Sequence, residues 1–212
     1  MDNIFKYRVK LSKDKNSITH HEKRKMLRDA LAASGLECAL NKGAPRFNLG
    51  PGAGVGEASL CEYSDICLTR QTDIEIIIKK FAPHITGGFK IESIKEVPYM
   101  LSSVEVLAQY AKYNIKGIKG DIDKAAQSQK IEYEITHENG MREIKNIKPF
   151  IYSIRRINGE EVELIIKLEV LRSLGAAQIL LMLPGLEIDE PRLEILRGAL
   201  MWQMSTGALE AV

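Results

Sequence analysis

The feature that most limits the possible folds is an alternation of apolar and polar residues near the N-terminus, followed at once by a helix signal. From Ile4 to Ser12 every second side chain is apolar, which is typical of a strand with one buried face. Thr19 stands three residues before Glu22, the spacing of a capping box, and precedes an amphipathic segment that reaches Ser34. The chain therefore predicts a strand whose apolar face packs against the helix that follows it.

The rest of the first half continues this pattern of strands and helices. Strands are predicted at residues 36–40, 60–69 and 89–97, and a helix capped by Asp73 at residues 74–81. The order β-α-β-β-α-β is that of a ferredoxin-like domain, whose two helices cover one face of the sheet. We therefore expect an α+β protein with a ferredoxin-like N-terminal half. Lys6, Arg8 and Lys10 should then line the uncovered face of the first strand.

Residues 98–103 read as a boundary, which predicts one domain at 1–98 and another at 104–212. The second half is also α+β, and its order of elements suggests a degenerate duplication of the first. Its expected strands are at 104–116, 131–136, 150–156 and 162–169, with hairpin turns at Asn139-Gly140 and Asn158-Gly159. Helices are expected at 121–129, 176–183 and 189–204. The last of these helices would carry Trp202.

Composition narrows the class of protein. No apolar run approaches the roughly 20 residues that a membrane-spanning helix needs, and the first residues lack the apolar core of a signal peptide. The three cysteines, Cys38, Cys61 and Cys67, form no CxxC pair. Reduced thiols of this kind are typical of a cytoplasmic protein. We therefore expect a cytoplasmic protein that does not contact a membrane and holds no metal.

A glycine-rich segment runs from Gly43 to Gly56. Its glycines at Gly50, Gly52, Gly54 and Gly56 occupy every second position. The spacing differs from that of dinucleotide-binding and P-loop motifs, and a strand follows where those motifs need a helix N-terminus. The segment therefore predicts a shaped turn or binding loop and no nucleotide cofactor.

The distribution of charge points to an anionic partner. Residues 1–28 hold nine basic and three acidic residues, a net charge of +6, whereas the whole chain has only +2. Nucleic acid is the commonest partner of such a segment, and a solvated charged surface is the alternative. The residues that we expect to contact phosphates are Lys6, Arg8, Lys10, Lys23, Arg24, Arg28 and Arg46. Arg46 is included because a guanidinium on a glycine-rich loop can bind a phosphate with two hydrogen bonds.

His20 is the candidate for chemistry. It opens the first predicted helix beside Lys23 and Arg24, and both the cations and the helix N-terminus favour a neutral imidazole, which suits a general base. A surface or capping histidine is the alternative. The chain contains no recognisable nucleophile motif.

Several sequence blocks together resemble the radical SAM-linked proteins, a bacterial family of unknown function. They are Tyr7-Arg8-Val9-Lys10-Leu11-Ser12-Lys13, Thr19-His20-His21-Glu22, Gly50-Pro51-Gly52-Ala53-Gly54-Val55-Gly56 and Glu62-Tyr63-Ser64-Asp65. Two departures stand out: Lys25 replaces an arginine of the family's pattern, and the loop before Pro45 is shortened. The resemblance implies a radical SAM enzyme as partner and work on RNA. Because the chain lacks a CxxxCxxC site, it would be the accessory member of such a pair.

The sequence is compatible with three functions. The first is a non-catalytic module that binds or presents RNA to a radical SAM enzyme during tRNA or rRNA modification or processing. The second is a metal-independent endoribonuclease that uses His20, with Arg46 or Lys25 steadying the transition state; this rests on similarity to the CRISPR repeat-processing endoribonucleases. The third is a protein scaffold that docks on its partner through the helix around Trp202.

Overall fold

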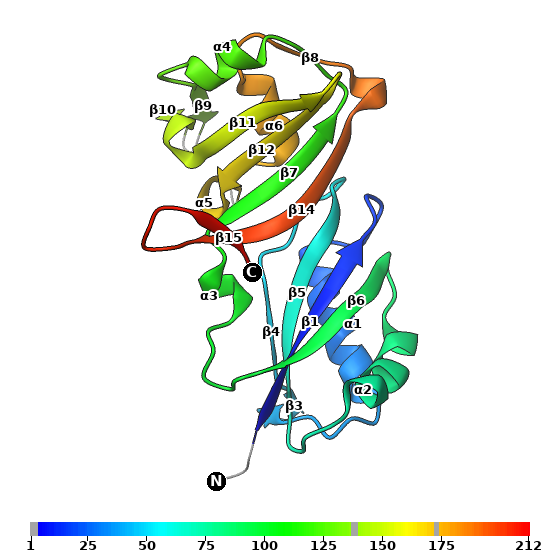
Figure 1. The fold of residues 1–212 in the computed structure, drawn as a ribbon. Helices are drawn as coiled ribbons and strands as arrows, with labels where there is room; N and C mark the ends of the chain where they lie inside the picture. The colour runs from blue at the N-terminus through cyan, green and yellow to red at the C-terminus, as the bar shows by residue number, and fades with distance from the viewer. Residues whose placement is uncertain (1–3, 137–139, 172–173) are drawn as a thin grey trace. The chain divides into compact units, whose positions relative to one another are not determined.

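The computed structural model describes residues 4–136, 140–171 and 174–212, and the chain divides into two compact units (Figure 1). The first unit runs to Ala108 and includes Val212, and the second covers Gln109–Ala211. Both contain helices and strands, which confirms the expected combination of α and β structure. In the part of the chain that is described, no helix is long and apolar enough to cross a membrane.

The first unit is an antiparallel sheet with helices packed on one face. Its elements are β1 (Phe5–Lys13), α1 (His20–Ala33), β2 (Leu40–Asn41), β3 (Ala44–Pro45), β4 (Phe47–Leu49), β5 (Ala58–Leu68), α2 (Ile74–Phe81), the 3-10 turn η1 (Ala82–His84), β6 (Phe89–Val97) and α3 (Val104–Leu107). The strand order is β4-β5-β1-β6, and each neighbouring pair is antiparallel. The core lies between this sheet and the helices α1 and α2.

The predicted start of the chain is confirmed. Tyr7, Val9 and Leu11 of β1 are fully buried in the core cluster that includes Leu27 of α1. The helix begins with the predicted capping box, in which the Thr19 hydroxyl accepts from the Glu22 N–H while the Glu22 carboxylate accepts from the Thr19 N–H. The structure of β1 and the start of α1 therefore follow from patterns among neighbouring residues in the sequence.

The prediction of a strand at 36–40 is wrong. Only Leu40–Asn41 is a strand there, and it forms a tight hairpin with β3. Lys42 and Gly43, with φ of 50° and 79°, make the turn. Gly43 is thus a hairpin residue rather than part of the later loop. The strand that joins the sheet beside β5 is instead β4, only three residues long and too short to show a clear alternation.

The second unit is built around the sheet β11-β12-β7-β14, with β15 added at β14. Its elements are β7 (Tyr110–Lys116), β8 (Ile118–Gly120), α4 (Ile122–Gln127), β9 (Glu132–Thr136), β10 (Arg142–Asn146), η2 (Lys148–Phe150), β11 (Ile151–Asn158), β12 (Glu161–Lys167), α5 (Leu168–Leu171), α6 (Ala176–Met182), β13 (Leu186–Ile188), η3 (Glu190–Arg192), β14 (Glu194–Gln203) and β15 (Leu209–Ala211).

The helix predicted at 121–129 is confirmed as α4, and the hairpin predicted at Asn158-Gly159 is confirmed as the β11–β12 connection. Asn158 pairs with Glu161, so the two turn residues are Gly159 and Glu160. The turn at Asn139-Gly140 includes Asn139, which lies outside the described residues. Two predictions in this unit are wrong. Residues 104–107 form α3 before the strand β7 begins, and the expected final helix is the strand β14, which pairs with β7 along most of its length. Trp202 therefore lies on a strand, and no helix presents it to a partner.

The two sheets share one strand order. If strands are numbered by their place along the chain within each sheet, both units have the order second-third-first-fourth. In both units a helix follows the first strand, and the neighbouring strands are antiparallel throughout.

Candidate functional site

The cations on the sheet face of β1 are largely buried. Arg8 is 9 % exposed and forms two hydrogen bonds with the carboxylate of Asp65, from Nε at 2.8 Å and from Nη2 at 3.0 Å. The two residues are direct partners across β1 and β5, so the strand register places them together. Lys6, 5 % exposed, donates its Nζ to the carbonyl oxygen of Leu101.

The expectation of an uncovered sheet face is therefore wrong for Lys6 and Arg8. The segment after β6 supplies main-chain acceptors to both: the Leu101 carbonyl to Lys6 and the Ser102 carbonyl, 2.9 Å away, to Arg8 Nη2. Arg46 forms a cation–π contact with the same segment, because its guanidinium carbon lies 5.5 Å from the ring centroid of Tyr99. Of the expected sheet-face cations, Lys10 is partly exposed.

The expectation that Lys23 contacts a phosphate also needs correction. Although the sequence suggested an exposed phosphate contact, Lys23 is 1 % exposed and its Nζ lies 2.7 Å from Glu62 Oε2. The other oxygen of Glu62 accepts the N–H of Ala53 at 3.0 Å. Burying an ammonium is costly unless it is paired, and Glu62 supplies the paired carboxylate for Lys23 while it also fixes the glycine-rich segment.

The glycine loop, residues 50–56, is held by charged side chains of its own unit. Lys13 Nζ donates to the carbonyl oxygens of Ala53 and Gly54 at 3.2 and 2.9 Å. The Gly54 N–H donates to Glu57 Oε2 at 2.9 Å. Carboxylates of the chain thus occupy the amides of Ala53 and Gly54, which a bound phosphate would otherwise use. The loop is consequently a fixed shape beside α1.

His20 lies against this loop. A Cβ atom built at Gly52 would stand 2.5 Å from Nδ1 of His20, so only glycine lets the backbone approach the imidazole this closely. Partial burial lowers the pKa of His20 below its usual 6.5, and the charges of Lys23 and Arg24 lower it further, against the opposing effect of Glu62. The imidazole is therefore mainly neutral at pH 7.

Arg24 and Arg28 follow His20 at intervals of four residues, which places the three side chains on one flank of α1. We call this set the α1 strip. Both arginines are exposed, and no ion pair is found for either among the described residues. The strip begins at the glycine loop, where the charge of Arg24 acts on the imidazole of His20. Arg24 and Arg28 are the exposed members of the predicted set that remain available to an outside anion, and Lys10 is partly exposed.

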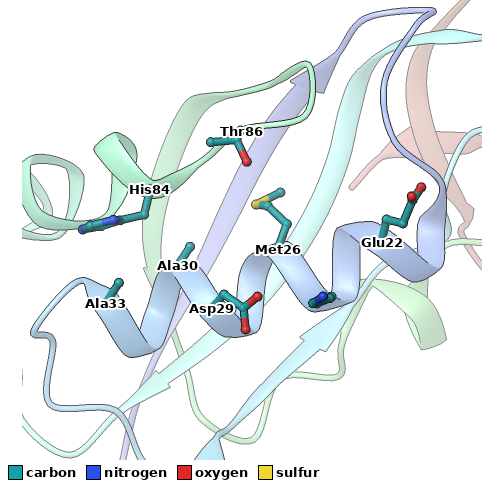
Figure 2. A pocket seen from close by; sticks show the side chains of 8 residues that line it. Glu22, Met26, Asp29, Ala30, Ala33, His84 and Thr86 are labelled. Carbon is teal, nitrogen blue, oxygen red and sulfur yellow. The ribbon is translucent and has the colours of Figure 1, made fainter.

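A shallow pocket lies on the opposite flank of α1 (Figure 2). Met26, Ala30 and Ala33 of the helix face His84 and Thr86 across it, and the polar residues Glu22, Lys25 and Asp29 complete its lining. Because Lys25 stands against the two carboxylates of Glu22 and Asp29, the pocket does not favour an anion. Sequence reasoning missed it, since it joins residues about 55 positions apart that share no local pattern.

The three cysteines and the possible metal ligands bear on two kinds of chemistry, that of a reactive thiol and that of a metal site. Cys38, Cys61 and Cys67 are free thiols, and burial raises the pKa of Cys38 to about 11, which disfavours its thiolate. In residues 4–136, 140–171 and 174–212, no group of three or more His, Cys, Asp or Glu side chains could hold a metal ion.

The fold and this site define an α+β protein of two units with a basic helix flank beside a fixed glycine loop. Residues 6–180 match the model of a family described as an uncharacterized protein conserved in bacteria, DUF2344, and the chain belongs to that family. No curated protein matches the chain.

Proposed function

We propose that this protein is a non-catalytic accessory module that binds RNA through the α1 strip. The observation that carries the proposal is the contrast between two groups of cations in the first unit. Arg8 and Lys23 are buried and neutralised by carboxylates, whereas Arg24 and Arg28 are exposed and without an ion pair among the described residues. Arginine is suited to this role because its planar guanidinium can donate two parallel hydrogen bonds to a phosphate.

The glycine loop would contribute shape to this surface. Because Lys13, Glu57 and Glu62 hold it in place, the loop forms a rigid edge at the start of the strip, and an RNA strand would lose no binding energy in ordering it. His20, neutral at pH 7 and partly exposed beside Gly52, could then stack on a base or donate a hydrogen bond to one.

The partner and the architecture are also part of this proposal. The resemblance of the N-terminal blocks to radical SAM-linked proteins supports a radical SAM enzyme as the partner to which RNA is presented. The strand orders β4-β5-β1-β6 and β11-β12-β7-β14 support a ferredoxin-like arrangement in each unit and an internal duplication. Ferredoxin-like sheets are used by several RNA-binding modules, but fold alone does not establish function.

Charge reversal on α1 tests the RNA-binding proposal. We expect Arg24→Glu/Arg28→Glu to reduce affinity for cellular tRNA or rRNA by at least about 100-fold at low salt, because two phosphate contacts become repulsions. The matched control is Lys79→Glu/Lys90→Glu, which makes the same change of charge at two exposed positions of the first unit. Fluorescence anisotropy with labelled RNA measures both.

Two outcomes contradict the proposal. One is the absence of RNA binding by the wild-type protein at low salt. The other is an equal loss of affinity in both double variants, which would show that only the net charge of the protein matters. Circular dichroism of each variant establishes that the fold is retained.

A second candidate function is RNA cleavage by His20, and the lowered pKa of this residue favours it. The neutral imidazole would take the proton of a ribose 2′-hydroxyl, the 2′-oxygen would attack phosphorus, and the bond to the 5′-oxygen would break as that oxygen takes a proton from water. The products are a 2′,3′-cyclic phosphate and a free 5′-hydroxyl. Arg24 would be the exposed cation that acts on this reaction, because Lys23 is buried against Glu62, Arg46 contacts Tyr99 and Lys25 lines the pocket on the other flank.

Metal-free incubation with structured RNA distinguishes the two functions. Cleavage that ends in a cyclic phosphate, and that His20→Ala abolishes while RNA binding is kept, supports the enzyme. Unchanged RNA in the presence of EDTA, with binding intact, supports the accessory module.

A further inference from the structure

The segment between β6 and α3, residues 98–103, lies across cations of the first unit, and we call it the strap. Most of the strap is exposed: the exposed fractions are 40 % for Tyr99, 87 % for Met100 and 38 % for Leu101. The strap ends at Val104, which is 2 % exposed and packs close to Gly50. The strap itself thus buries little apolar surface, although the residue that follows it is firmly placed.

Polar contacts hold the strap down. Lys6 donates to the Leu101 carbonyl, Arg8 donates to the Ser102 carbonyl at 2.9 Å, and Arg46 lies over the ring of Tyr99. Within the strap, the Leu101 N–H donates a main-chain hydrogen bond to the Pro98 carbonyl oxygen. A segment with few buried apolar contacts opens more easily than the strands beneath it.

The three cations Lys6, Arg8 and Arg46 differ in whether their charge is neutralised by a carboxylate. Arg8 is paired with Asp65, which lies on β5 and is not part of the strap. For Lys6 and Arg46, no carboxylate partner is found among the described residues. Their acceptors are a neutral carbonyl oxygen and an aromatic ring. A phosphate oxygen is a stronger acceptor for either cation than these groups are, because its hydrogen bonds are charge-assisted.

We propose that the strap is an internal competitor of RNA: it covers Lys6 and Arg46, and its opening exposes a second phosphate-binding surface on the sheet. This inference rests on RNA as the ligand of the α1 strip and adds a regulated surface to it. Binding at this surface requires that the strap leave the sheet, so any change that weakens the strap should strengthen RNA binding.

Cys67 reports strap opening without any ligand. It is 3 % exposed and is the direct partner of Lys6 across β1 and β5, so it shares the face that the strap crosses. Cys61, 1 % exposed and six residues earlier on β5, is an internal control. The rate at which each thiol reacts with an alkylating reagent, followed by peptide mass spectrometry, separates local opening of the strap from opening of the whole unit.

The test variant is Tyr99→Ala, which removes the ring that the Arg46 guanidinium contacts. Its matched control is Met100→Ala in the same strap, and Tyr99→Phe should restore wild-type behaviour because it keeps the ring. For Tyr99→Ala we expect alkylation of Cys67 to be about two- to fivefold faster, the factor that one exposed cation–π contact provides, with Cys61 unchanged. RNA affinity should rise by a similar factor.

Each other outcome overturns a defined part of this inference. An unchanged alkylation rate at Cys67 shows that the strap does not open there. Faster alkylation with unchanged or weaker RNA affinity shows that the strap does not compete with RNA. If none of the proteins binds RNA, the proposed function fails together with the competition, although the Cys67 rates would still establish whether the strap opens.

Discussion

Burial divides the N-terminal cations into two groups with different tasks. Lys6, Arg8 and Lys23 satisfy groups inside the first unit, whereas Arg24 and Arg28 face solvent. These two groups could not be distinguished from the sequence, because the carboxylates that pair with Arg8 and Lys23 are 57 and 39 residues away along the chain. Only the register of β1 on β5 brings Asp65 to Arg8. A basic segment is thus weak evidence for a basic surface until its partners are known.

The Arg8–Asp65 pair should behave as a buried ion pair. Arg8→Met leaves the Asp65 carboxylate buried without its partner, and we expect the free energy of unfolding to fall by about 3–5 kcal/mol. Arg8→Met/Asp65→Leu removes both charges and should recover most of this loss. Urea denaturation measures all three proteins and the Asp65→Leu single variant. Additive losses in the double variant would show that the two residues do not act as a pair.

His20 should make stability depend on pH. Because its pKa is lowered in the folded protein from 6.5, the unfolded chain binds a proton more readily than the folded one does as the pH falls through 6.5. The folded state therefore loses stability in that window, and above it the residue contributes nothing. We expect wild-type protein to lose more stability between pH 7.5 and pH 5.5 than His20→Asn does, as measured by thermal unfolding. Identical losses in the two proteins would contradict this assignment.

At the scale of elements, local signals predicted the structure where local interactions decide it. The alternation in β1, the capping box of α1 and the Asn158-Gly159 turn were all readable, because each depends on neighbours in sequence. The strand β14 was not readable. Its leucines follow a helical spacing, but pairing with β7, about 80 residues earlier, outweighs that preference. For the site, the sequence identified the loop and His20, but it could not show that they touch.

Each amide of the glycine loop that donates to a carboxylate should be protected from hydrogen exchange by its own hydrogen bond. Glu57→Ala removes the carboxylate that accepts the Gly54 N–H, and a hydrogen bond to a charged group is worth about 1.5–3 kcal/mol. We expect hydrogen exchange at the Gly54 amide to rise by about tenfold or more. The neighbouring Ala53 amide, which donates to Glu62, is the internal control and should keep its rate. Equal acceleration at both amides would mean that the loop opens as one piece and that Glu57 has no specific role at Gly54.

At the scale of the whole molecule, both units combine the same strand order with a buried carboxylate on the third strand. Asp65 on β5 is paired with Arg8, and Glu163 on β12 is 2.7 Å from Lys112 and 2.7 Å from Arg155. Burial alone would raise the pKa of Glu163, but its hydrogen bonds from Arg155 and Lys112 outweigh this and lower it. The second unit, however, has no glycine loop of the spacing found in the first. The two units therefore share a framework, and the candidate site is confined to the first.

The salt dependence of RNA binding tests the central claim most directly, because it counts phosphate contacts. Each contact to a single strand adds about 0.7 to the slope of log K against log salt concentration. If Arg24 and Arg28 each hold a phosphate, Arg24→Met/Arg28→Met lowers the magnitude of that slope by about 1.4, while Lys79→Met/Lys90→Met leaves it unchanged. An unchanged slope in the α1 variant, or an equal decrease in both variants, would contradict the account.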